Sequence, residues 1–139
     1  MKVLKSKFVP SYKVVHLTEK DQQYESLKKV FDKHGYAFLA QSTIFIDESK
    51  LKRDDMFTSG HLLFIESHEI AHAVLGHSKT HRDPTQEAEA DYVGILLCKD
   101  KNDNNSAIEV GKKYFEIRNG ISYKDFHVKH GKKLHDKIK

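Results

Sequence analysis

The stretch HEIAHAVLGH, residues 68–77, places three histidines and one glutamate among aliphatic residues. The apolar positions in and before it repeat with the helical period, so we expect a helix from about Ser59 to His77. On a helical wheel most aliphatic residues share one face, and His68 and His72 lie nearly opposite it. Ionisable groups are costly to bury without partners. The histidine-bearing face is therefore expected to border a site and not open water.

His68 and His72 are four residues apart, so both imidazoles project from one side of the helix and can bind one ion. Glu69 lies off that axis, where its carboxylate can reach a water molecule without being a metal ligand. This HExxH arrangement is typical of two zinc ligands and a general base. It predicts His68 and His72 as ligands and Glu69 as the catalytic base. The simpler alternative is a helix with two satisfied histidines and a surface glutamate.

The next segment supplies a third candidate ligand. Asp83 can cap a second helix, PTQEAEADYVGILLC at residues 84–98. This helix carries Glu87 and, one turn later on the same face, Asp91. A chain that returns antiparallel would bring Glu87 against the two histidines as a third zinc ligand and leave a fourth position open. Asp91 could then accept a hydrogen bond from the other ring nitrogen of a ligand histidine, His68 in our interpretation.

Three other residues compete with Glu87 for this role. Glu89 lies about 200° from Glu87 around the helix, so both cannot face the metal, and the ExxxD spacing favours Glu87. His77 lies one helical step from the ligand face and is expected at the rim or the end of the helix. His81 follows in the turn. A third histidine in the pattern HExxHxxGxxH would fall at position 78, which is a serine.

The combination of HEIAHAVLGH with EAEADYVGILL resembles the gluzincin class of zinc peptidases and is similar in detail to the small ImmA/IrrE-type peptidases. The match covers about residues 36–98 and is specific at His68, Glu69, His72, Glu87, Ala90 and Asp91. The resemblance implies a minimal zincin-like fold, in which the active-site helix and the glutamate helix pack beside a small β-sheet. It also implies Zn²⁺ as cofactor, the same three ligands and base, and a protein substrate such as a transcriptional regulator. Many family members carry a further domain, whereas we expect one domain over residues 1–139.

The expected reaction is hydrolysis of a peptide bond. Zinc would polarise the scissile carbonyl and acidify a water molecule, while Glu69 takes the water proton and passes it to the leaving amine. One further donor would stabilise the oxyanion. The candidates for this donor, which the sequence does not separate, are Tyr114, Tyr123, His127 and His130. A strand at residues 42–47 could bind substrate by edge addition or could belong to the core of the sheet.

The rest of the chain predicts an α+β fold with a mostly helical C-terminal part. An amphipathic helix is expected over residues 18–34, with Thr18 as its N-cap. Two short strands, rich in aromatic and β-branched residues, are expected over residues 36–40 and 42–48, followed by a polar connection at 49–55. Beyond the two helices of the site we expect a polar loop over 99–106, a helix over 107–118, a turn at Asn119–Gly120 and a short final helical segment.

The composition is ordinary for a soluble chain, with 38% hydrophobic and 32% charged residues among 139. No segment approaches the length needed to span a membrane, so we expect no membrane partner. The single cysteine, Cys98, has no partner for an internal disulfide. It is expected to be a core residue, and the simplest compartment is the reducing cytoplasm.

The net charge of +4 comes largely from the C-terminal end, where residues 112–139 hold nine Lys and Arg against three acidic residues. A solvated basic face is the simpler interpretation, and contact with nucleic acid or an acidic partner is the alternative. A second hypothesis for function is a non-catalytic zinc-binding regulatory protein that uses this face, with His77 closing the site as a fourth ligand. Structural zinc sites are usually closed by four protein ligands, and these are often cysteines. The single cysteine of this chain therefore weighs against a structural zinc site. A metal-dependent hydrolase of other substrates is a third alternative.

Overall fold

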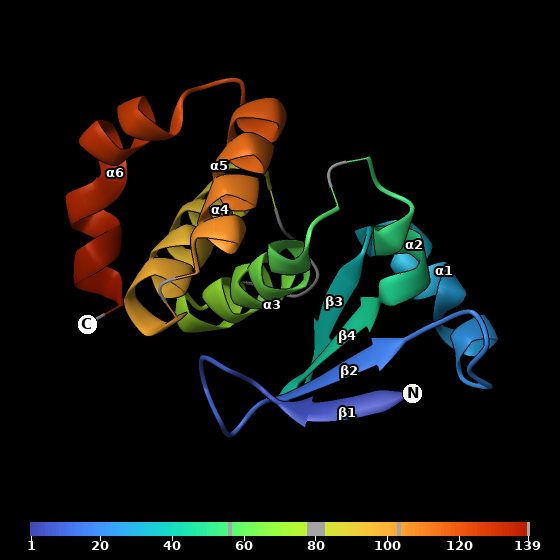
Figure 1. The fold of residues 1–139 in the computed structure, drawn as a ribbon. Helices are drawn as coiled ribbons and strands as arrows, with labels where there is room; N and C mark the ends of the chain where they lie inside the picture. The colour runs from blue at the N-terminus through green and yellow to red at the C-terminus, as the bar shows by residue number, and fades with distance from the viewer. Residues whose placement is uncertain (56, 78–82, 103, 139) are drawn as a thin grey trace. The chain divides into compact units, whose positions relative to one another are not determined.

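The computed structural model describes residues 1–55, 57–77, 83–102 and 104–138. Within them the chain forms both helices and a small β-sheet, which confirms the expected α+β class (Figure 1). The chain divides into two compact units, Met1–Thr58 and Ser59–Lys139. Each unit is described by itself, and the single domain over residues 1–139 stays a prediction. No helix among the described residues is both long and apolar enough to cross a membrane.

The first unit contains a four-stranded mixed sheet in the order β1-β2-β4-β3. Its strands are β1 (Lys2–Lys5), β2 (Lys13–Leu17), β3 (Ala37–Ala40) and β4 (Thr43–Asp47). β4 pairs in parallel with β2 and antiparallel with β3, so that Ile44 lies opposite both Val14 and Leu39. Because β4 has a partner on each side, it presents no free edge to a substrate. Edge addition at residues 42–47 was therefore the wrong alternative, and the interpretation as sheet core is confirmed.

Two helices complete this unit, and both differ from the expectation. The helix predicted over residues 18–34 begins six residues later, as α1 (Tyr24–His34), because the Asp21 carboxylate accepts a 2.8 Å hydrogen bond from Thr18 N and holds a turn there. The expected polar connection at 49–55 contains a short helix, α2 (Glu48–Lys52), which the Asp47 side chain caps. The core between sheet and helix consists mainly of Val15, Leu17, Tyr24, Phe31 and Phe38.

The second unit is helical. Its elements are α3 (Ser59–Val74), α4 (Pro84–Leu97), the short π-helix η1 (Cys98–Asn102), α5 (Asn105–Asn119) and α6 (Tyr123–Lys137). Helices α3, α4 and α5 pack on one another, and α6 packs against α4 and α5. The two helices of the site begin where the sequence predicts, since Asp83 caps α4 through a hydrogen bond from Gln86 N. The expected polar loop over 99–106 contains η1 instead, and the final segment is a full helix of 15 residues.

The second unit brings α4 very close to α3. A Cβ atom on Gly94 of α4 would lie 3.2 Å from the backbone N and Cα of His68 and from the Ser67 hydroxyl. A Cβ atom here would be in tighter contact than is usual, so a side chain would push the two helices slightly apart. The close approach sets the distance between the histidines of α3 and the acidic residues of α4.

Candidate metal centre

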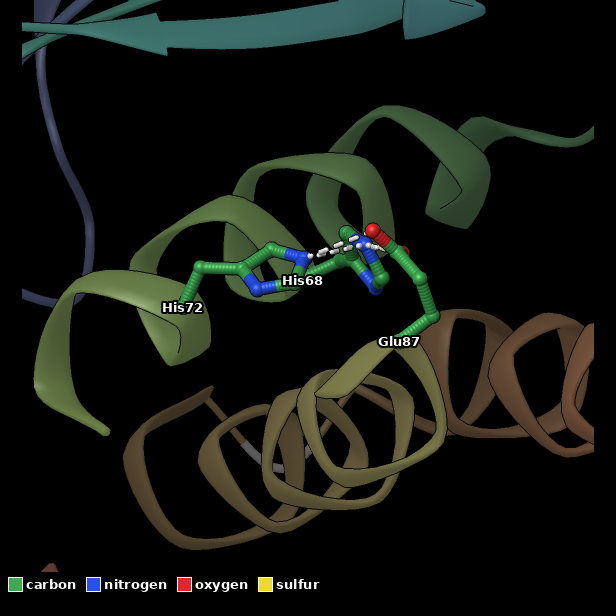
Figure 2. Close-up of side chains that lie close together, drawn as sticks. All are labelled: His68, His72 and Glu87. Carbon is green, nitrogen blue, oxygen red and sulfur yellow. Dashed lines mark hydrogen bonds and ion pairs between the residues drawn. The ribbon is translucent and has the colours of Figure 1, made fainter. Parts of the chain in front are cut away.

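The expected ligand set converges in the second unit. Figure 2 shows His68 and His72, from neighbouring turns of α3, and Glu87, from α4, with their polar ends directed toward one another. Among the described residues, these three form the one group of histidine, cysteine or acidic side chains with a spacing that could hold a metal ion. Both histidines are buried, and Glu87 is partly exposed. The antiparallel return of α4 therefore brings together residues that are up to 19 positions apart in the sequence.

The distances within the group fit a single ion. Nε2 of His68 lies 3.1 Å from Nε2 of His72 and 3.1 Å from Oε2 of Glu87, and Nε2 of His72 lies 3.4 Å from Oε1 of Glu87. Two ligand atoms of one tetrahedral zinc are about 3.3 Å apart, because each lies about 2.0–2.1 Å from the ion. The donor atoms thus already stand at nearly the separations of a tetrahedral face. The same separations suit hydrogen bonds, so a proton can hold the group together when no metal is bound.

Within this group His68 favours its positively charged form and Glu87 its negatively charged form. Burial lowers the pKa of His68, but the contacts with the Asp91 and Glu87 carboxylates outweigh burial and raise the pKa to about 9. Burial raises the pKa of Glu87, but the two imidazoles outweigh it and hold that pKa well below its usual range. A cation at the centre is therefore favoured by this environment, whether it is a proton on His68 or a metal ion.

Glu69 lies beside the group without joining it. Its Oε2 atom is 3.8 Å from Nε2 of His68, and the residue is only 4% exposed. This is the position expected for a carboxylate that can reach a water molecule at the metal but is not a ligand.

Asp91 lies behind His68, at the ring nitrogen that faces away from the group. Its Oδ1 atom is 2.8 Å from Nδ1 of His68, the contact expected from the ExxxD spacing, although the angle is poor for a hydrogen bond. The carboxylate is 1% exposed and also accepts hydrogen bonds from Arg118, at 2.7 Å, and from Asn119, at 3.3 Å. Sequence reasoning missed Arg118 and Asn119. A residue on α5 that pairs 27 positions back, across two packed helices, leaves no local signal in the sequence.

His77 and Glu89, two of the rival ligands, lie behind His72 instead. Nδ1 of His77 is 2.9 Å from Nδ1 of His72, and Nε2 of His77 is 3.1 Å from Oε1 of Glu89. The nitrogen of His72 that faces His68 and Glu87 is Nε2, so neither rival belongs to the group of three. The remaining rival, His81, lies outside the described residues.

The four candidates for the oxyanion donor are spread over α5 and α6. Tyr123 and His127 stack on Tyr92, and the His130 ring packs at a tilt against Phe126. The Tyr114 ring stacks on Phe64, whose own ring centre is 6.3 Å from that of His68. Of the four, Tyr114 is thus linked to a candidate ligand through one intervening ring.

Comparison with known proteins adds no relative. A scan against protein-family models found no match to this chain, and searches of curated proteins and of solved structures found none either.

Proposed function

We propose that this chain is a zinc-dependent metallopeptidase with a minimal zincin-like fold. The observation that carries the proposal is the convergence of His68 Nε2, His72 Nε2 and the Glu87 carboxylate, with Glu69 at their side. Two imidazoles and one carboxylate are a ligand set typical of catalytic zinc, which keeps a position open for water or substrate. The resemblance of the two motifs to gluzincin peptidases supports the same function.

The residues divide the work of hydrolysis. Bound zinc would supply a Lewis acid that polarises the scissile carbonyl and acidifies a water molecule. Glu69 then accepts the proton of the attacking water and delivers it to the leaving amine. Asp91 holds the His68 ring in one orientation, so that its Nε2 stays directed at the ligand position. Tyr114 is the donor that we favour for the developing oxyanion, because its ring stacks beside the ring that adjoins His68.

The substrate is proposed to be a cytoplasmic protein or peptide, such as a regulatory protein, as the family resemblance implies. The main alternative is a non-catalytic zinc-binding protein whose basic C-terminal face holds a partner, with nucleic acid as the less favoured choice. That alternative needs a closed metal site, and His77 was the residue expected to close it. The contact of His77 with the far nitrogen of His72 favours the open, catalytic site.

Turnover by the wild type and by Glu69→Gln tests the proposal. Both proteins are loaded with zinc, their metal content is measured by mass spectrometry, and cleavage of a peptide library is followed by mass spectrometry. We expect one equivalent of zinc in both proteins and cleavage by the wild type alone. Glu109→Gln, the same change at an exposed position of α5, is the matched control and should keep full activity. Cleavage retained in Glu69→Gln would contradict the mechanism, and zinc bound without any cleavage by the wild type would favour the non-catalytic alternative.

A second pair of variants tests the choice of ligand. Glu87→Ala should lose zinc affinity, whereas Glu89→Ala should still bind one equivalent. The reverse result would show that Glu89 is the ligand.

A further inference from the structure

We propose that His77 and Glu89 form a positioning pair that fixes the tautomer and orientation of His72 for metal binding. The inference rests on the proposed metal centre, but not on the peptidase reaction. Its evidence is a continuous path of contacts: Glu89 Oε1 to His77 Nε2 at 3.1 Å, then His77 Nδ1 to His72 Nδ1 at 2.9 Å. The path ends on the nitrogen of His72 that faces away from the ligand group, so it would act on the metal through His72.

The end of α3 places His77 at this position. Gly76 has a left-handed backbone conformation, with φ of 71°. His77 N donates to His72 O at 3.0 Å, and Gly76 N donates to Ala73 O at 3.2 Å. This pair of hydrogen bonds is the Schellman pattern that closes a helix at a C-terminal glycine. It ties the backbone of His77 to the residue whose ring His77 also contacts.

The protons along this path have only one arrangement that suits a metal. A histidine that binds an ion through Nε2 must leave that nitrogen unprotonated, so the proton of neutral His72 is on Nδ1. Nδ1 of His77 must then accept this proton's hydrogen bond, and the His77 proton is on Nε2. From there it donates to the Glu89 carboxylate, which can only accept. Glu89 thus selects the tautomer of His77, and His77 selects the tautomer of His72.

The two candidate ligand histidines are therefore held in different ways. His68 meets a carboxylate directly, since Asp91 lies at its Nδ1. His72 meets a carboxylate through one intervening imidazole. The side chain of His77 is only 6% exposed and that of Glu89 14%, so little water competes for these contacts. Outer partners of metal-bound histidines commonly contribute 10- to 100-fold to metal affinity.

Zinc affinity in three variants at one position tests the pair, by competition with a chromophoric chelator. His77→Phe keeps a ring but removes both contacts, and we expect zinc to bind about 10- to 100-fold more weakly. His77→Asn places an amide oxygen near the former Nδ1 and should recover most of the affinity. His77→Gln places its amide near the former Nε2, leaves His72 without an acceptor, and should resemble His77→Phe. His34→Phe, at an exposed position of α1, is the matched control and should leave affinity unchanged.

A second measurement reports the tautomers directly. In zinc-loaded protein with ¹⁵N-labelled histidine, we expect long-range NMR correlations to show His77 neutral and protonated on Nε2. Glu89→Ala should remove this preference. A purely structural role of His77 would leave the zinc affinity of all three variants alike, and that result would overturn the inference. X-ray absorption that counts three imidazoles at zinc in the wild type and two in His77→Phe would also overturn it, because His77 would then be a ligand.

Failure of the inference and failure of the proposed function give different results. If zinc binds and no peptide is cleaved, the peptidase function fails while the affinity series still tests the pair. If peptide is cleaved and His77→Phe binds zinc like the wild type, the pair alone fails. Failure of the wild-type protein to bind zinc would overturn both.

Discussion

Gly94 lies directly against the backbone of His68, since a Cβ atom on Gly94 would be 3.2 Å from both N and Cα of that residue. Gly94→Ala therefore has two opposing effects. Alanine favours a helix over glycine by about 0.8–1.0 kcal/mol, whereas overpacking costs about 1–3 kcal/mol. We expect a net loss of stability of less than about 2 kcal/mol in urea unfolding. Because the backbone that must yield carries His68, zinc affinity should fall about tenfold. Thr85→Ala, on the exposed side of α4, should change neither quantity, and unchanged zinc affinity in Gly94→Ala would contradict the expected coupling.

Replacement of Asp91 is expected to weaken zinc binding more than replacement of Arg118, which contacts it. Asp91 is 1% exposed and contacts His68, Arg118 and Asn119, so Asp91→Asn removes a buried charge from three partners at once. We expect zinc affinity to fall about 10- to 100-fold in this variant. The Arg118 side chain is 41% exposed, and His68 and Asn119 would still contact Asp91 without it, so Arg118→Gln should lower zinc affinity less than Asp91→Asn does. Zinc titration of both variants measures the two affinities. A larger loss of zinc affinity in Arg118→Gln than in Asp91→Asn would contradict the prediction.

The single cysteine should be unreactive in the folded protein. Cys98 is 0% exposed, and burial raises the pKa of its thiol to about 11, although a hydrogen bond to Ser67 opposes this rise. The thiolate is the reactive form. We expect iodoacetamide at pH 8 to modify the native protein at least about 100-fold more slowly than the urea-unfolded chain, because both burial and the raised pKa act against it. Equal rates in the two states would show that Cys98 is accessible, and mass spectrometry of the alkylated protein measures both.

The two helices of the site were predictable because their signals are local. The helical period of residues 59–77 and the Asp83 cap of α4 each depend on residues within a few turns, and both predictions are confirmed in outline. The convergence of Glu87 on the histidines could also be predicted, since a tight return between two helices leaves few other arrangements. The same reasoning singled out Asp91 as the partner of His68.

What the sequence did not reveal depends on distant parts of the chain. Strand β1 is exposed along its whole length, and β2 pairs in parallel with β4, which lies 30 residues further along, so neither has a clear local pattern. Arg118 reaches Asp91 only because α5 packs beside α4. His77 was placed at the helix end, as the structure confirms, but its contact with His72 depends on the left-handed turn at Gly76. A helical wheel continues the helix through that glycine and cannot predict such a contact.

The metal-free protein should lose stability as the pH rises toward 9. Burial lowers the pKa of His68, but the Asp91 and Glu87 carboxylates outweigh it and raise the pKa to about 9, above the ordinary value of 6.5. A group whose pKa is higher in the folded state stabilises the fold fully below its unfolded pKa, and this contribution is lost as the pH rises through the folded value. The window therefore runs from about pH 6.5 to about pH 9. Glu87 has a lowered pKa, so its contribution is present above pH 4.5 and is lost only in stronger acid.

With zinc bound, the stability of the fold should rise with pH instead of falling. The reason is that a ligand histidine must give up its proton to bind the ion. At pH 7 we expect zinc binding to release about one proton from His68, measured by calorimetry in buffers of different ionisation enthalpy. Urea unfolding with a chelator should show a fall in stability between pH 6.5 and 9 in the wild type, and this fall should be smaller in His68→Gln. An NMR titration of the metal-free protein reports the His68 pKa itself. A value at or below 6.5 would contradict the prediction and would mean that the carboxylates of Asp91 and Glu87 do not hold a cation at this site.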